Sequence, residues 1–113
     1  MQDDTDPRLV LRPVQASPYA VMICLSGELD SHTTVLLSEV IAQTASRRDD
    51  HTRLLLDLSA LTYCDNAGLF TLLGICQALN AVGINISIPW TGTIADEAIA
   101  LAGLQHRLPL RAQ

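Results

Sequence analysis

The chain has 113 residues, of which 49% are hydrophobic and 17% are charged, so it is long enough and apolar enough to bury the core of a single domain. Aromatic residues make up only 4%, so leucine, isoleucine, valine and alanine must fill that core. The formal net charge is −5 and there is no lysine, which excludes the clustered basic surface that nucleic acid or an anionic membrane requires.

Residues 1–8 are polar, and we expect them to form a flexible N-terminus ahead of one domain over residues 9–110. They lack the apolar stretch of a signal peptide. No segment reaches the roughly 18 apolar residues that would predict a membrane span. We therefore expect a cytoplasmic protein without membrane insertion.

The N-terminal part of the domain predicts two strands. Apolar residues alternate over residues 9–14, which indicates an edge strand, where Pro13 is tolerated. Residues 19–25 form a nearly continuous apolar run, which is typical of a central strand buried on both faces.

A helix and a second buried strand follow. Asp30 and Ser31 offer side chains that can cap an amphipathic helix over residues 33–45. Residues 47–51 then form a charged loop, and the leucine-rich residues 53–59 predict a strand.

The next segment predicts a helix over residues 66–81, with Gly83 just past its end. Either Asp65 or Asn66 is expected to cap its free amides, a reading we prefer to an anion site because Asp65 would repel a phosphate. A strand with one wetter face follows over residues 84–88 and is expected to stop at Pro89.

The C-terminal part predicts a helix over residues 94–102, capped by Thr93 and ended by Gly103. Residues 108–110 are a candidate for a short last strand. The order of elements predicts an α/β fold of mixed type, in which three or more helices pack on a mixed sheet of four or five strands.

Three segments, in this order and spacing, resemble the STAS family, named for sulphate transporters and anti-sigma factor antagonists. The first is Leu-Ser-Gly-Glu-Leu-Asp at residues 25–30. The second combines Leu-Leu-Asp-Leu-Ser at 55–59 with Leu-Thr-Tyr-Cys-Asp-Asn-Ala-Gly-Leu at 61–69, and the third is Ile-Ala-Leu-Ala-Gly-Leu at 99–104. The similarity covers about residues 9–110 and implies a STAS-like fold.

The resemblance implies a bacterial regulator of transcription that works by partner switching rather than by catalysis. In such antagonists the loop and helix that match residues 65–77 bind a serine kinase that also sequesters a sigma factor, and phosphorylation of the first serine in the loop ends the binding. Asn66 stands at this phosphoacceptor position and has no hydroxyl. The phospho-switch therefore cannot operate there.

A second STAS role is the small cytosolic subunit of an ABC-type lipid transport complex, in which the same helix docks on an ATPase and needs no phospho-switch. A second copy of the chain is a further candidate partner. A small hydrolase or nucleotide-binding enzyme is the alternative of another class. It is disfavoured because no residues combine a nucleophile, a base and an orienting group.

The helix over residues 66–81 is expected to present a docking stripe. At about 100° per residue, one arc, expected to face the sheet, holds Gly68, Leu69, Leu72, Ile75, Cys76 and Leu79. The opposite arc holds Asn66, Phe70, Thr71, Gly74 and Gln77, with Leu73 at its border. Phe70 is either an exposed docking residue or part of the core beneath a neighbouring loop. We predict that it is exposed in the free domain.

The predicted partner-binding residues belong to the resembling loops and to this stripe. They are Asp30, Asp65, Asn66, Ala67, Gly68, Leu69, Phe70, Leu73 and Gln77. Asp30 and Asp65 are expected to approach one another at the same end of the sheet.

No metal site and no cofactor is predicted. Cys24, Cys64 and Cys76 form neither a CxxC pair nor a zinc spacing, so we expect reduced and mostly buried thiols rather than a redox or metal role. Asp57 ends a strand and is interpreted as a structural acceptor for loop amides.

Overall fold

The computed structural model describes residues 8–47 and 52–110. The expectations for residues 1–7 and for the loop residues 48–51 lie outside the described residues. Seven elements follow one another in the order predicted from the sequence. They are β1 (Leu9–Ser17), β2 (Ala20–Leu29), α1 (Thr34–Arg47), β3 (Arg53–Cys64), α2 (Asn66–Ala81), β4 (Ile86–Trp90) and α3 (Gly92–Ala102).

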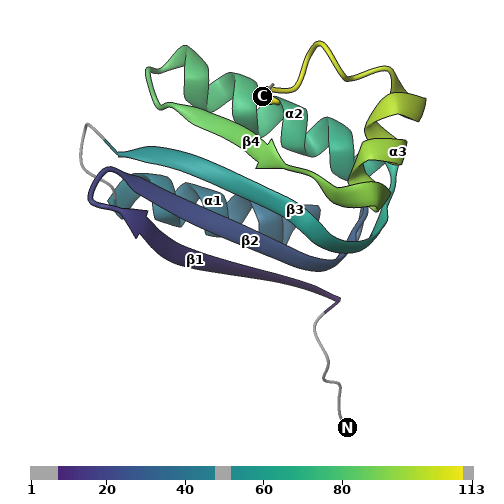
Figure 1. Ribbon diagram of the computed structural model, residues 1–113, viewed down its shortest axis with the longest axis horizontal. Coiled ribbons are helices and arrows are strands. Elements are labelled where there is room, and N and C mark those ends of the chain that lie inside the picture. Colours follow the sequence, from purple (N-terminus) through teal and green to yellow (C-terminus); the bar gives the residue numbers. More distant parts are fainter. Residues whose placement is uncertain (1–7, 48–51, 111–113) are drawn as a thin grey trace, which may run out of the picture.

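The four strands form one mixed sheet in the order β1-β2-β3-β4 (Figure 1). β1 and β2 are antiparallel, whereas β2, β3 and β4 run parallel to one another. The two parallel steps are made through α1 and α2, as expected for strands that alternate with helices. The predictions of a mixed sheet, and of β2 and β3 as its central strands, are confirmed.

The core lies between the sheet and the helices α1 and α2. Leu54, Leu56 and Leu58 alternate along β3 and are fully buried, and Leu37 and Ile41 of α1 are buried as well. On the opposite face of the sheet Met22 and Leu55 are only half-buried, so the prediction that the 19–25 strand is buried on both faces is only partly correct.

β1 is a free edge of the sheet. Glu28 donates its amide to the carbonyl of Arg8, so these opposed residues form a hydrogen-bonded pair. Pairs of that kind alternate along an antiparallel ladder, which places Pro13 in a non-hydrogen-bonded pair with Ile23. The nitrogen of Pro13 therefore faces the open edge, where a missing N–H costs no ladder bond and hinders pairing with another strand.

All four strands differ in their bounds from the prediction. β1 ends at Ser17 rather than 14, and β2 runs from Ala20 to Leu29 rather than from 19 to 25. β3 continues five residues beyond the predicted 59 to Cys64, held along its whole length by β2. β4 begins at Ile86 rather than 84 and continues through Pro89 to Trp90. The prediction that Pro89 ends the strand was wrong, because β4 borders the sheet and a proline is tolerated in such a strand.

The C-terminal part also differs in detail. α3 starts at Gly92 with Thr91 at its N-cap, so Thr93 is not the cap, while Gly103 ends the helix as predicted. In place of a last strand over residues 108–110 there is a single parallel bridge between Ile88 and Leu110.

Candidate protein-binding site

The connection between β3 and α2 is fixed by hydrogen bonds at both of its ends. The amide of Asp65 donates to the carbonyl of Leu29 at 3.1 Å, which ties the loop to the end of β2. The carboxylate of Asp65 accepts the amide of Gly68 at 2.9 Å. Asp65 has extended backbone angles and is the N-cap of α2, so of the two predicted capping residues it is Asp65 that caps and Asn66 that begins the helix.

Gly68 allows the first turn of α2 to lie directly against β2. A Cβ at this position would stand 2.7 Å from both the Cγ and the carbonyl oxygen of Leu29, closer than atoms can approach. The helix start is therefore held between a cap and a backbone contact. This leaves little freedom in how the exposed residues of the first turn are presented.

The outer side of α2 carries most of the predicted stripe. Asn66, Ala67, Phe70 and Gln77 are exposed, and Phe70 keeps 47% of its surface accessible. The prediction that Phe70 is exposed in the free domain is confirmed.

Three other residues of the predicted set do not reach this surface. Leu73 is only 3% exposed, and Gly68 and Leu69 are also buried. Leu73 was placed at the border of the stripe and that position was wrong, because α2 contacts α1 on one flank and α3 on the other, which widens its buried arc.

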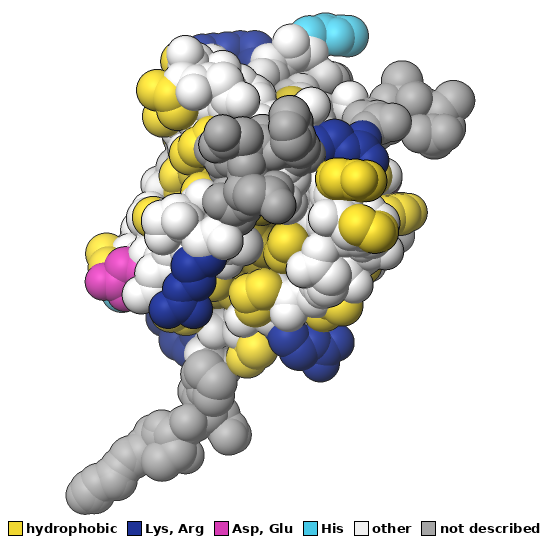
Figure 2. All heavy atoms as spheres, turned by 90° about the vertical axis from the view of Figure 1, so that its left-hand side faces the viewer, with side chains coloured by type: hydrophobic (Ala, Val, Ile, Leu, Met, Phe, Trp, Pro, Cys, Tyr) yellow, Lys and Arg dark blue, Asp and Glu magenta, His cyan; other side chains and the backbone are white. Residues whose placement is uncertain are grey.

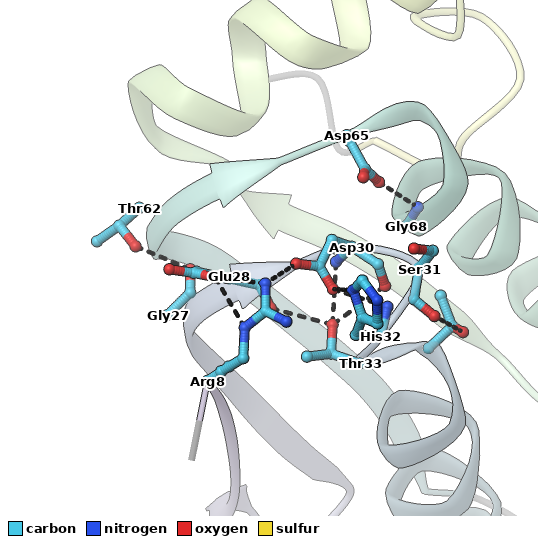
Figure 3. Close-up of polar contacts among 11 residues, drawn as sticks. Arg8, Gly27, Glu28, Asp30, Ser31, His32, Thr33, Thr62, Asp65 and Gly68 are labelled. Atoms are coloured by element: carbon cyan, nitrogen blue, oxygen red, sulfur yellow. Dashed lines mark hydrogen bonds and ion pairs between the residues drawn. The ribbon is translucent and has the colours of Figure 1, made fainter. Parts of the chain in front are cut away.

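Asp30 belongs to an ion-pair cluster at the same end of the sheet (Figure 3). The guanidinium of Arg8 contacts the carboxylates of both Asp30 and Glu28, and it lies 2.8 Å from Glu28. The hydrogen bond to Glu28 raises the pKa of Arg8 above its usual value. Gly27, with a φ of 102°, permits the close approach of the Arg8 backbone, since a Cβ there would stand 2.2 Å from the Arg8 carbonyl oxygen.

The Asp30 side chain is turned inward rather than presented to a partner. The residue is 4% exposed, and its carboxylate also accepts the amide of His32 at 2.8 Å. Asp30 is therefore a buried residue that shapes the loop, and not the surface contact predicted from the sequence. It does not cap α1 either, because α1 begins at Thr34 and its first hydrogen bond runs from the amide of Leu37 to the carbonyl of Thr33, which places Thr33 at the cap position.

Asp30 and Asp65 come together as predicted, as two walls of one hollow. The hollow has a volume of about 330 Å³ and is open to solvent. Its lining residues are Arg8, Glu28, Asp30, Ser31, His32, Tyr63 and Asp65. Figure 3 shows Asp65 at the start of α2 opposite the Asp30 cluster. The sequence therefore identified both acidic walls of the hollow.

A STAS domain model matches residues 12–112, which is nearly the whole chain. The chain belongs to the STAS family. Its four-stranded mixed sheet with three helices is thus a STAS fold.

Solved anti-sigma factor antagonists share the fold of this STAS domain. It is similar to such an antagonist from Mycobacterium paratuberculosis, with 22% identity, a TM-score of 0.75 and coverage of 93% of this chain and 86% of that one. It is also similar to unphosphorylated SpoIIAA, with 18% identity, a TM-score of 0.67 and coverage of 92% and 90%. A STAS domain from Rhodobacter sphaeroides matches with 13% identity, a TM-score of 0.60 and coverage of 83% and 95%.

Five of the seven residues that line the hollow were not among the predicted partner-binding residues, namely Arg8, Glu28, Ser31, His32 and Tyr63. Arg8 was assigned to the flexible terminus, yet its side chain and carbonyl hold Glu28 and Asp30. Tyr63 was only part of a matching phrase and is 50% exposed. The contacts of Arg8 join residues at least 20 positions apart, and no local pattern in the sequence indicates such pairs.

The remaining candidate residues of this STAS domain have structural roles. Asp57 accepts the amide of Ser59 at 2.9 Å and also its hydroxyl, so its predicted role as a structural acceptor is confirmed. The amide belongs to β3 and not to a loop, because the strand continues past Asp57, with an irregular register against β2 at this point. All three cysteines are free thiols. Burial raises the pKa of Cys76 to about 12, and burial, assisted by Asp65, raises the pKa of Cys64 to about 11. None of the helices in the described ranges is long and apolar enough to span a membrane.

Proposed function

We propose that this STAS domain is a non-catalytic, cytoplasmic protein-binding module that acts as an anti-sigma factor antagonist. Its partner is an anti-sigma factor of the serine-kinase type, bound by the start and the outer side of α2. The observation that carries the proposal is Phe70, the only phenylalanine of the chain, which is 47% exposed on a helix whose other side buries Leu69, Leu72 and Cys76 in the core.

An exposed aromatic side chain on a well-fixed helix has the properties of a binding anchor. Aromatic residues are prominent among those that dominate binding energies, because they bury a large apolar area with few rotatable bonds. The Asp65 cap and the contact of Gly68 with Leu29 hold the first turn in place before any partner arrives. Pre-ordering of this kind lowers the entropy lost on association.

Asn66 gives the proposed module a distinct mode of regulation. It is exposed at the first position of α2, but it offers no hydroxyl to a kinase. The nearest hydroxyls named from the sequence are Ser59 and Thr62, which are exposed, and Thr71, which is half-buried. Binding is therefore constitutive, or its control lies at a residue other than 66.

The missing hydroxyl at Asn66 also favours a second candidate, a small STAS subunit that docks on the ATPase of an ABC-type lipid transport complex. Such a subunit uses the same helix and has no need for a phosphoacceptor. The two candidates differ in the partner rather than in the surface.

Binding assays with both partner classes separate the candidates. The wild-type domain, Phe70→Ala and Val82→Ala are titrated against the purified anti-sigma factor kinases and ABC ATPases of the source organism. Val82 is a suitable control, because it is 74% exposed at the opposite end of α2. Saturable binding to a kinase-type factor, weakened by Phe70→Ala but not by Val82→Ala, is the expected result. Binding to an ABC ATPase alone would favour the second candidate, and binding to neither class would contradict both.

A gain-of-function variant tests the role assigned to position 66. With a kinase-type partner and ATP, the wild-type domain should gain no phosphate within residues 64–69, which contain no serine or threonine. Asn66→Ser should become phosphorylated there and release the partner, while Asn66→Ala should remain bound. An Asn66→Ser domain that the bound kinase leaves unmodified would argue against the proposed partner class.

A further inference from the structure

Helix α3 has a second apolar side that the core uses only in part. Ala95 and Ile99 point into the core and are buried. Ile94, Ala98 and Leu101 follow at i, i+4 and i+7 spacing and so form a second stripe. Leu101 is 90% exposed and Ile94 is 39% exposed. Ala98 is half-buried and packs against the core, so Ile94 and Leu101 are the residues of this stripe that the core leaves exposed.

This second stripe forms one wall of a groove. The other wall is the end of β3, where Thr62, Tyr63 and Cys64 line the space. The groove has a volume of about 210 Å³ and is open to solvent. Tyr63 is half-exposed, and the Cys64 thiol stays protonated at neutral pH because its pKa is raised to about 11. The groove is thus mainly apolar.

The surroundings of the groove are acidic. Glu97 lines the groove itself, and Tyr63 forms a wall shared with the neighbouring hollow. Glu28, Asp30 and Asp65 line that hollow together with one arginine, Arg8, whose guanidinium pairs with Glu28 and with the buried Asp30, so the acidic lining residues outnumber the arginine. The end of the molecule that Figure 2 shows is different among the described residues, because their arginine side chains lie there among hydrophobic ones and their acidic side chains are seen only at the margin.

We propose that this groove binds an amphipathic helix of a partner protein whose apolar stripe is flanked by arginine or lysine. The apolar side chains pack on Ile94, Leu101 and Tyr63, and the basic side chains reach Glu97 and the acidic hollow. A second copy of this chain fits poorly as the occupant, because the chain has no lysine and a net charge of −5, so two acidic grooves repel one another. The groove itself is lined by residues of β3 and α3 and by none of the α2 residues assigned to the anti-sigma partner, although the acidic hollow beside it borders Asp65, the N-cap of α2. The proposal does not depend on the function proposed above.

Two synthetic helical peptides of equal length serve as probes. Both carry leucine at i, i+3, i+4 and i+7, with arginines flanking the stripe in one peptide and glutamates in the other. Each is titrated into methyl-labelled domain, and binding is followed by NMR. The arginine peptide should shift the methyl resonances of Ile94, Ala98 and Leu101 and the ring resonances of Tyr63. It should bind at least about tenfold more tightly than the glutamate peptide, with a preference that shrinks as salt is added.

Three variants test the assignment. Leu101→Ser should weaken binding of the arginine peptide about tenfold without changing the fold, because the side chain makes little contact with its own domain. Glu97→Gln should reduce the preference for arginine over glutamate. Val82→Ser, which removes a similarly exposed side chain far from the groove, should change neither.

The proposal is overturned if both peptides bind equally, or if the shifts centre on Phe70 rather than on the groove. It is also overturned if sedimentation shows a dimer that Leu101→Ser dissociates, since the occupant would then be a second copy. Failure of Phe70→Ala to affect the anti-sigma partner would leave this result untouched, so the two proposals fail separately.

Discussion

The two sides of helix α2 differ sharply in burial, although they share one backbone. On the inner side Leu69, Leu72 and Cys76 are buried against the sheet, and they are part of the core that holds the domain together. On the outer side Asn66, Phe70 and Gln77 are exposed, and among the described residues no packing role explains why a phenylalanine stands there.

The contrast teaches that burial, not hydrophobicity, separates structural from functional residues on this helix. Phe70 is as apolar as Leu72, yet only Leu72 is removed from solvent. Two glycines show the same contrast. A Cβ at Gly68 would clash with Leu29, whereas a Cβ at Gly74 would have no atom outside its own helix within 4 Å. Paired substitutions on the two sides should therefore have different effects.

The largest difference is expected between Leu72→Ala and Phe70→Ala. Leu72→Ala leaves a cavity in the core and should lower the free energy of unfolding by about 2–5 kcal/mol. Phe70→Ala should change it by about 0.5 kcal/mol or less. Urea unfolding followed by circular dichroism measures both. Equal destabilisation by the two variants would mean that Phe70 belongs to the core.

The glycine pair should give effects of opposite sign. Gly68→Ala forces a methyl group into the Leu29 backbone and should destabilise the domain by about 1–3 kcal/mol. Gly74→Ala adds a methyl group in open space and improves helix propensity, so it should stabilise the domain by up to about 1 kcal/mol. Thermal unfolding of the two variants in one buffer checks the sign. A destabilised Gly74→Ala would show that space is not what distinguishes the two positions.

Asp65 and Asn66 are neighbours, and the sequence alone left open which of them caps α2. Asp65→Ala removes the acceptor for the Gly68 amide and should cost about 1 kcal/mol of stability. Asn66→Ala should be close to neutral. If Asn66→Ala proved the more costly of the two in the same unfolding assay, the cap would have been assigned to the wrong residue.

The smallest effect concerns the thiols of Cys64 and Cys76. The pKa of Cys64 is raised from 9.0 to about 11 and that of Cys76 from 9.0 to about 12. The unfolded chain therefore releases these protons first, and stability that is present below pH 9 is lost as the pH rises above it. At pH 8 iodoacetamide should modify both cysteines slowly in the folded domain and rapidly in guanidinium, as peptide mass mapping would show. Rapid modification of Cys76 in the folded domain would contradict its burial.

Periodic patterns in the sequence predicted the elements well, because β2, β3 and α2 are long and their apolar residues repeat regularly. The bounds of α2 match the prediction at both ends. The patterns failed where a neighbour decides the outcome. Leu73 is buried by the helices that flank α2, and β4 continues through Pro89 at the border of the sheet. Neither the burial of Leu73 nor the border position of β4 can be seen in the residues next to it in the sequence.

The candidate site was predictable to a similar extent. The cap at Asp65 or Asn66 could be assigned from capping chemistry, and the exposure of Phe70 from its angular position on the helix. The inward turn of Asp30 could not, because it depends on Arg8, 22 positions away in the sequence. Long-range ion pairs are set by the assembled fold and not by spacing along the chain.

The central claim is that the outer side of α2 binds a partner while its inner side holds the fold. The most direct test is the affinity of Phe70→Ala for a partner that binds the wild-type domain, measured by titration calorimetry beside the unfolding free energy of the same sample. We predict at least about a 30-fold loss of affinity, or about 2 kcal/mol, with the stability unchanged. Unchanged affinity in a stably folded Phe70→Ala domain would contradict the account.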